Sequence, residues 1–406
     1  MKRYVLLALL FSLLSGSSLK SLIANLDNDL LKSKDMQILS AKGAIGAIKS
    51  GYYPTVDVGA FAQSLSPKTP MRAGATYSLY AKLNYVIYDG GLKSNTIKQK
   101  RFELVSKVFE REQFKDALIL QVVQDFFAIK SLNALIGATK VKKNSIKEQL
   151  FKGKKLYSAG LMGLDELARL EAALELVNYN IKSLDFQKKS FLSALSLKVG
   201  KSVKGVANSH FIKRRVGFSA NSTIRAIRAR ALAISSSADV IKSSNSAKVN
   251  LALEHNKFAY ARYDRAHPKG LNSQSKVTLS ANMRLYDGGA TKQKAQVAKL
   301  QAASALLEAK YKLKEQRANY KLAQLRLKSI RAKIKSAKAA LKAANRLYGS
   351  VLTKYNQGLV DNSLLLDALS SKTQATAELS RAKNDLEIAY ALYYYYAGKN
   401  LKGLIR

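Results

Sequence analysis

The segment TYSLYAKLNYVIYDGG, residues 76–91, decides the fold. Its odd positions from Tyr77 to Ile87 are all apolar, and most of its even positions are polar. This period of two predicts a β-strand with one apolar face. The Tyr-Asp-Gly-Gly end then leads into residues 92–155, which contain no proline and carry apolar residues at helical spacing. The segment therefore predicts a strand that runs into a very long helix.

The same segment recurs 198 positions later. Tyr-Asp-Gly-Gly at 88–91 returns at 286–289, again after an alternating stretch, 277–285. The same offset relates three further pairs: Tyr157 and Tyr355, Gly160-Leu161 and Gly358-Leu359, and Gly200-Lys201 and Gly398-Lys399. Because an internal repeat fixes the structural unit, the chain is predicted to be a tandem duplication of one strand-to-helix unit.

Each half is predicted to contain a helix, two strands, a long helix, a glycine turn and an antiparallel return helix. The strands are 54–63 and 76–88 in the first half, and 248–263 and 277–285 in the second. The helices before them are 19–49 and 221–246, and the long helices are 92–155 and 291–354. The domains are a signal peptide at 1–18, a first repeat at 19–200, a linker at 201–220, a second repeat at 221–400 and a tail at 401–406.

The N-terminus has the form of a secretory signal peptide. Lys2 and Arg3 precede an apolar run at 4–14, and small residues at 15–18 suit cleavage. The run has about half of the ~20 residues that a spanning helix needs, so export without an anchor is predicted. We expect no other apolar stretch of spanning length. The chain has no cysteine, which excludes disulfides, cysteine metal sites and an acylated N-terminal cysteine.

The chain is strongly basic, with 69 lysine and arginine residues against 27 acidic ones and a formal net charge of +42. In a cytosolic protein this charge would indicate nucleic acid binding, but the signal peptide argues against that partner. The cations are spread along the long helices, so a solvated helical surface is the first interpretation. The alternative is a surface or lumen that attracts anionic cargo or acidic partner helices.

The predicted strands have the length and the terminal tyrosines of transmembrane β-barrel strands. A soluble sheet with two different faces is the alternative. His255 and Lys257 fall on the face that would meet lipid, which suggests a bulge or a misread register in the third strand. Four strands cannot close a barrel, and an open edge cannot face lipid, so several chains are needed. Two chains would supply eight strands and three would supply twelve.

Both strand exits carry a glycine pair, Gly90-Gly91 and Gly288-Gly289. A chain that passes from a strand into a helix turns sharply, and glycine tolerates φ > 0. The preceding Asp89 and Asp287 suit a helix N-cap. A generic turn explains either dipeptide alone, whereas recurrence at both exits favours a junction that belongs to the architecture.

Together these features resemble the TolC family of outer-membrane efflux and secretion channels. The resemblance covers essentially the whole mature chain: the repeat, Tyr53-Pro54 at a strand start, the two Tyr-Asp-Gly-Gly exits, and the turns Tyr-Ser-Ala-Gly-Leu and Tyr-Asn-Gln-Gly-Leu. It implies an α+β membrane protein, a homotrimer with a twelve-stranded outer-membrane β-barrel and a periplasmic α-helical barrel of long antiparallel coiled coils. Gly160 and Gly358 would form turns at the periplasmic tip.

The function that the resemblance implies is a passive exit duct for efflux or type I secretion. The protein would lie in the outer membrane, contact its lipid and extend into the periplasm. Its partners would be a periplasmic adaptor (membrane fusion) protein and an inner-membrane efflux pump or ABC-type transporter. A secreted or surface coiled-coil structural or adhesion protein without channel activity is the alternative. A periplasmic adaptor would need lipoyl-like β segments around a single hairpin, which two repeats with strand pairs do not supply.

The resemblance also assigns residues at the tunnel end, where the family closes its pore with acidic residues. Aligned on Tyr355 and Gly358, Asp367 matches one acidic position and Leu364 stands at the other. Three copies of Asp367 would attract cations and Leu364 would add a hydrophobic constriction, although a solvated aspartate is the alternative. The polar links of the closed state would use Tyr355 and Glu166. Val360 stands where the family often has an arginine.

No catalytic, metal or cofactor site is predicted. His210, His255 and His267 fall in the linker, a strand and a loop, without the spacing of metal ligands. No glycine-rich phosphate loop with its lysine follows a strand, so no nucleotide site is expected. We therefore predict that the protein is not an enzyme and that a partner supplies the energy.

Overall fold

The computed structural model describes residues 16–67, 73–261 and 271–406. Most of the expected signal peptide, the last two residues of the predicted strand 248–263 and His267 thus lie outside the described residues. The chain divides into two compact units. The helical unit holds the described residues up to Lys34, Arg111–Thr223 and Lys312–Arg406, and the sheet unit holds Asp35–Glu110 and Ile224–Tyr311.

The two longest helices have the same length and occupy equivalent positions in the two repeats. Helix α4 is Leu92–Ser158 and α7 is Ala290–Asn356, and each has 67 residues. Both ends of α7 lie 198 positions after those of α4, so the offset found in the sequence also relates the elements. A helix of this length spans ~100 Å at a rise of ~1.5 Å per residue. The expected tandem-repeat plan of an α+β protein is confirmed.

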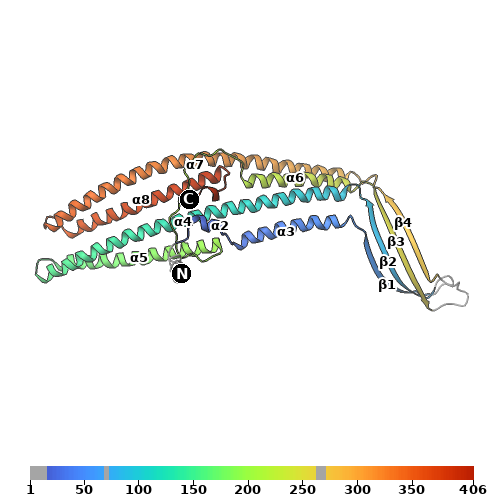
Figure 1. Cartoon of the computed structure of the whole chain (residues 1–406), viewed down its shortest axis with the longest axis horizontal. Helices are drawn as coiled ribbons and strands as arrows, with labels where there is room; N and C mark the ends of the chain where they lie inside the picture. Colours follow the sequence, from blue (N-terminus) through green and yellow to red (C-terminus); the bar gives the residue numbers. More distant parts are fainter. Residues whose placement is uncertain (1–15, 68–72, 262–270) are drawn as a thin grey trace, which may run out of the picture. The chain divides into compact units, whose positions relative to one another are not determined.

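Each long helix is followed by a return helix. Gly160 and Gly358 both turn the chain at φ 72°, which glycine adopts without a Cβ clash. Helix α5 (Leu164–Val199) then runs back beside α4, and α8 (Asn362–Tyr396) runs back beside α7 (Figure 1). The predicted antiparallel hairpins are therefore present in both halves.

The core of the helical unit joins both halves of the chain. Phe126 and Phe127 of α4 pack in one cluster with Tyr394 of α8 and with Phe211 of the linker. Residues 201–220 contain no helix, and the buried Glu387 carboxylate accepts a hydrogen bond from the Phe211 backbone N at 2.7 Å. The chain ends in a short 3-10 helix, η1 (Lys402–Leu404), against the same core.

Four antiparallel strands form one sheet in the order β1-β2-β3-β4. They are β1 (Thr55–Ser64), β2 (Ala75–Tyr88), β3 (Lys248–Ala261) and β4 (Ser273–Asn282) (Figure 1). The central β2–β3 pair joins the first repeat to the second. Strands β1 and β4 are the two edges.

Three shorter helices complete the part of the fold that the structure describes: α2 (Leu19–Ala24), α3 (Asp29–Ser50) and α6 (Ser222–Ser243). The single helix predicted at 19–49 is wrong, because the chain breaks before α3, where Asn28 Oδ1 accepts hydrogen bonds from the backbone N of Leu30 and Leu31 at 3.0 and 3.2 Å. Ser17 forms a bridge with Val206, and the Ser18 side chain caps α2.

The strand predictions need two corrections. The fourth strand ends at Asn282 and not at 285, because Asn282 pairs with Lys248, the first residue of β3. A misread register in the third strand is also wrong, since His255 pairs with Ala81 and Lys257 pairs with Leu79 on the apolar face. The ladder is irregular elsewhere, between Val86 and Tyr88 of β2.

Helix α4 corrects the expectation about apolar stretches. One 18-residue window in it reaches a mean hydropathy of 1.3, enough by length and composition to cross a membrane, and 44% of that window is buried. The same helix contributes Ile119, Val122, Val123, Phe126, Phe127 and Ile129 to the protein core. Their burial within the protein explains the apolar composition.

Candidate functional site

The two strand-to-helix junctions have one geometry. Gly90 and Gly91 have φ of 69° and 81°, and Gly288 and Gly289 have φ of 65° and 83°. Asp89 Oδ1 accepts from the Gly91 backbone N at 3.0 Å, and Asp287 Oδ1 accepts from the Gly289 backbone N at 3.0 Å. The second oxygen of each aspartate accepts from the backbone N of the second helical residue, Lys93 or Thr291, at 2.9 Å. Each aspartate therefore caps the helix that follows it.

The second junction carries one additional side-chain link. Asn245 Nδ2, which lies just after α6, donates to Asp287 Oδ2 at 3.0 Å. At the first junction a Cβ on Gly90 would overlap the Ser246 side chain, whereas Gly288 and Gly289 face open space. The loop before β3 thus packs against the first junction more closely than any group packs against the second glycine pair.

Leu364 and Asp367 lie on one exposed face near the start of α8. They are three residues apart and therefore neighbours on the helix surface. Leu364 is 45% exposed and Asp367 is also exposed, while Leu365, Ala368 and Leu369 are buried on the other side of the helix. The Leu364 backbone N donates to the N-cap Asp361 at 3.1 Å. Both side chains are free to line a constriction.

A cation that the sequence analysis missed lies beside Asp367. Lys142 of α4 is half-buried and donates from Nζ to Ser370 Oγ at 2.5 Å. Burial lowers the pKa of Lys142, and the negative charge of Asp367 partly offsets that effect. An Asp367 ring would therefore include compensating lysines. Lys142 and Asp367 lie far apart in the chain, and no spacing rule could have paired them.

Tyr355 and Glu166, the predicted closed-state links, influence each other electrostatically. Burial raises the pKa of the Tyr355 hydroxyl, and the negative charge of Glu166 raises it further. Val360 packs with Tyr355 around a small apolar cluster of Val351, Leu365 and Ala368. An apolar contact thus occupies the position where the family often has an arginine.

An arginine is present nearby, on the other hairpin. Arg169 lies on α5, one turn after Glu166, and its positive charge contributes to the lowered pKa of Asp361. The larger cause of that lowering is the Ser363 hydroxyl, which donates to Asp361 Oδ2 at 2.7 Å. The i, i+3 spacing of Glu166 and Arg169 was a signal in the sequence that we did not use.

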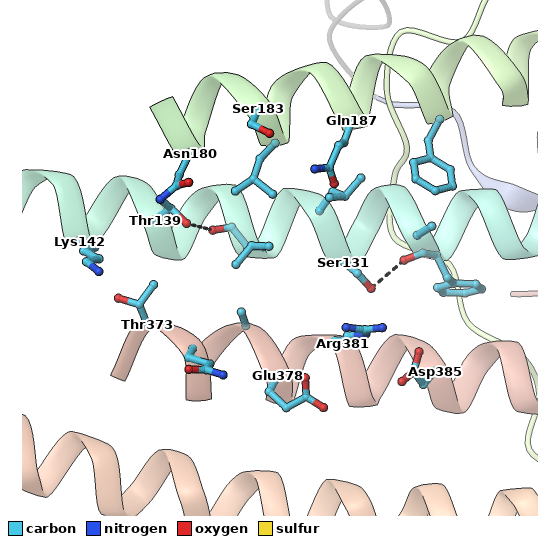
Figure 2. Close-up of a pocket in the computed structure, with 18 of the residues that line it drawn as sticks. Ser131, Thr139, Lys142, Asn180, Ser183, Gln187, Thr373, Glu378, Arg381 and Asp385 are labelled. Carbon is cyan, nitrogen blue, oxygen red and sulfur yellow. Dashed lines mark hydrogen bonds between the residues drawn. The ribbon is translucent and has the colours of Figure 1, made fainter. Parts of the chain in front are cut away.

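A groove of about 840 Å³ lies between α4, α5 and α8 in the helical unit (Figure 2). Its apolar lining includes Leu132, Leu135, Val177, Leu184 and Phe191. Asn180, Ser183 and Gln187 enter it from α5, and Thr373, Glu378 and Arg381 enter it from α8. The mixture suits the two faces of an amphipathic helix.

The sheet exposes a broad apolar surface. Val56, Val58, Leu79, Val277 and Leu279 are all well exposed. They lie on one face, because Val56 and Val58 pair with Leu83 and Ala81, and these pair onward with β3 and β4. A large contiguous apolar surface indicates contact with a partner or a membrane.

The described residues contain no group of three or more histidine, aspartate or glutamate side chains that could hold a metal ion. His255 Nδ1 instead lies 2.9 Å from Ser275 Oγ, and His210 Nδ1 lies 3.4 Å from Glu387 Oε1. Both described histidines thus have polar partners in the fold.

Comparison with known proteins supports the resemblance. Residues 23–200 match the model of the family described as outer membrane efflux protein. No match was found among curated proteins.

Solved structures match along nearly the whole chain. CusC, whose structures are described in terms of transmembrane channel formation, has a TM-score of 0.80 at 13% identity, and the match covers 94% of this chain and 92% of CusC. The Campylobacter jejuni CmeC outer membrane channel has a TM-score of 0.79 at 18% identity, with coverage of 94% and 85%. The Vibrio cholerae outer membrane protein VceC has a TM-score of 0.76 at 14% identity, with coverage of 94% and 96%.

At these identities the structural likeness establishes the fold. The resemblance of the sequence to the TolC family is therefore confirmed, by the outer membrane efflux protein model over residues 23–200 and by a fold shared with outer-membrane channels over 94% of the chain.

Proposed function

We propose that the chain is one subunit of a passive outer-membrane channel for efflux or type I secretion. The observation that carries this proposal is the sheet, which exposes one apolar face, has two edge strands, and leads through capped glycine junctions into 67-residue helices. An apolar sheet face with open edges is stable in lipid only when other chains close it into a barrel. The long helices would form the periplasmic tunnel, and the channel itself performs no chemical step.

The repeat predicts how neighbouring copies pair. Strand β4 starts at Ser273, 198 positions after the start of β2 at Ala75. Strand β3 starts at Lys248, 193 positions after the start of β1 at Thr55. If β4 of one copy pairs with β1 of the next as β2 pairs with β3, the pair Leu83–Leu253 maps onto Ala281–Ala60. Three copies joined in this way would close twelve strands, which is wide enough for a conduit.

The energy would come from an inner-membrane transporter, coupled through a periplasmic adaptor. The groove between α4, α5 and α8 supports this part of the proposal, since its lining suits an amphipathic helix of the adaptor. A Ser183→Trp substitution would fill the groove. The variant should lose adaptor-dependent export in cells, while its conductance in a bilayer stays that of the wild type. If export is also unchanged, the adaptor binds elsewhere.

Planar-bilayer conductance tests the channel directly. The purified protein should give long-lived channels that divalent cations block from one side only. Asp367→Ala should weaken the block because it removes the acidic ring. Lys142→Gln should strengthen it because it removes the compensating charge. Unchanged block in both variants would move the constriction away from α8, and a folded oligomer without channels would favour a coiled-coil structural protein.

A further inference from the structure

The exposed apolar face of the sheet is ordered in rows across the four strands. One row is Val56, Leu83, Leu253 and Val277, and it is apolar on every strand. The next row toward the end of the sheet away from α4 and α7, here called the distal end, is Val58, Ala81, His255 and Ser275. The row after that is Ala60, Leu79, Lys257 and Ser273. Both distal rows change from apolar to polar between β2 and β3.

The opposite end of the same face changes in the complementary way. Beyond Asn282, where β4 stops pairing, the alternation continues in the sequence with Met283 and Leu285. These side chains are 60% and 86% exposed. Compared with β1, β4 therefore loses its apolar side chains earlier at the distal end and keeps them further at the helix end. An apolar band that crosses the sheet diagonally explains both observations.

The predicted contact between β4 of one copy and β1 of the next, here called the seam, indicates the same direction for the diagonal band. Within one copy, the row through Ala60 meets β4 at Ser273, whereas across the seam Ala60 lies beside Ala281. Equivalent residues of symmetric copies lie at one depth in the membrane. The register must therefore shift by eight residues, from 273 to 281, over the four steps from one strand to the next around a copy. This is a shift of two residues per step. Each row rises toward the distal end from β1 to β4, in agreement with the polarity change.

We infer that the boundary of the hydrocarbon layer crosses this face diagonally, and that Lys257, supported by His255, binds phosphate groups of lipid in the distal leaflet. The inference rests on the proposed function. Strands ~4.8 Å apart and tilted by ~45° change depth by ~3.4 Å per step, or roughly 10 Å from β1 to β4. Val58 then lies in hydrocarbon while Ser275, in the same row, reaches the headgroups.

The groups around Lys257 suit a phosphate ligand. Lys257 and His255 are both exposed and stand on the same face of β3, one row apart. Ser273 and Ser275 provide hydroxyls opposite them on β4, and the His255–Ser275 contact of 2.9 Å fixes the imidazole. The carboxylate of Glu254 points to the other face, where it lies opposite Lys276 and Lys82. No acidic side chain thus competes with the phosphate in these two rows.

Depth measurements test the diagonal boundary. Because the chain has no cysteine, Val58→Cys and Ser275→Cys each accept one fluorescent label without a background. In phosphatidylcholine vesicles, acyl-chain bromine should quench the label at position 58 at least about twofold more than a headgroup nitroxide does, and position 275 should show the reverse. Equal depth of the two labels would overturn the inference while leaving an inserted channel intact.

Lipid enrichment tests the phosphate contact. In vesicles that contain phosphatidylglycerol with a headgroup spin label, a fluorescent label on Ala259→Cys, an exposed position two residues beyond Lys257 on the same face of β3, should be quenched about twofold more than bulk lipid composition predicts. Lys257→Gln should remove that excess. Lys276→Gln, the matched control on the opposite face, should retain it. An equal loss in both variants, or no excess in the wild type, would overturn the contact. A protein that fails to insert and conduct would refute the proposed function itself.

Discussion

At the scale of single residues, Asp116 of α4 shows how packing sets a charge state. Its carboxylate is largely buried and accepts from Ser222 Oγ at 3.3 Å. Burial raises the pKa of Asp116 to about 6, and the negative charge of Glu112 adds to the rise. The same carboxylate also contributes to the raised pKa of Tyr395, which burial mainly causes. The start of α6 therefore packs against a carboxyl group that titrates near neutral pH.

Asp116 should make stability fall as pH rises. A carboxyl group whose folded pKa is raised binds its proton more tightly in the folded state, so the penalty is absent below about pH 3, where both states are protonated, and complete above about pH 6. Partial exposure reduces the effect to on the order of 1 kcal/mol. Asp116→Asn should therefore unfold at a higher temperature than wild type at pH 8 and at the same temperature at about pH 3. A constant difference at both values would contradict the account.

The sequence proposes Asp367 and Leu364 as constriction residues but does not indicate which side chains lie beside them. Asp367 and Leu364 could be located because glycine turns at a fixed offset give the alignment. Lys142 could not, because its proximity to Asp367 depends on how α4 packs beside α8. Arg169 could have been found from its helical spacing to Glu166. Spacing along the sequence could locate neighbours within one helix, but it could not locate contacts between helices.

At the scale of elements, the helix ends depend on tight glycine contacts. Gly200 and Gly398 end α5 and its counterpart α8 with φ of 77° and 68°. A Cβ at Gly398 would overlap the Ser219 carbonyl oxygen, which also accepts from Gln316 Nε2 at 2.9 Å. A Cβ at Gly200 would similarly overlap the Asp27 carbonyl oxygen. The two return helices are therefore held against neighbouring backbone by glycines at equivalent positions.

Gly398→Ala should destabilise the protein more than Gly288→Ala. Both glycines have left-handed φ, which costs alanine ~1 kcal/mol. Only Gly398 adds a backbone clash, so its substitution should cost roughly 2 kcal/mol more, while Gly288 faces open space. Denaturant unfolding of the two variants gives the comparison. Equal losses would show that the Ser219 contact does not determine this helix end.

Long periodic elements were predictable and their interruptions were not. The strand and helix types at 76–88 and 92–155 follow from residue period, and the structure differs from them by only a few residues at each end. The break at Asn28 depends on side-chain caps, and the end of β4 depends on where β3 begins. His255 and Lys257 were correctly assigned to the apolar face, but the boundary that they mark needed the pairing of all four strands.

In the whole molecule as proposed, neighbouring copies close the sheet. The repeat explains why closure is possible, because β1 is the counterpart of β3 and β4 is the counterpart of β2. Since β2 and β3 pair within one copy, β4 and β1 of neighbouring copies can pair in the same way. In the proposed channel it also predicts a register between neighbouring copies, which neither the period of a strand nor the count of strands could provide. An antiparallel seam would leave no open edge toward lipid.

The most direct test is a cysteine cross-link across that seam. In the cysteine-free chain, Ala60→Cys with Ala281→Cys should place two thiols opposite each other on neighbouring copies, with Cβ atoms ~5 Å apart. Oxidation should give a covalent ladder that ends at the trimer. Ala60→Cys with Val277→Cys, displaced by four residues, should remain monomeric. No cross-link in the first pair, or one of equal yield in the second, would contradict a barrel closed in this register.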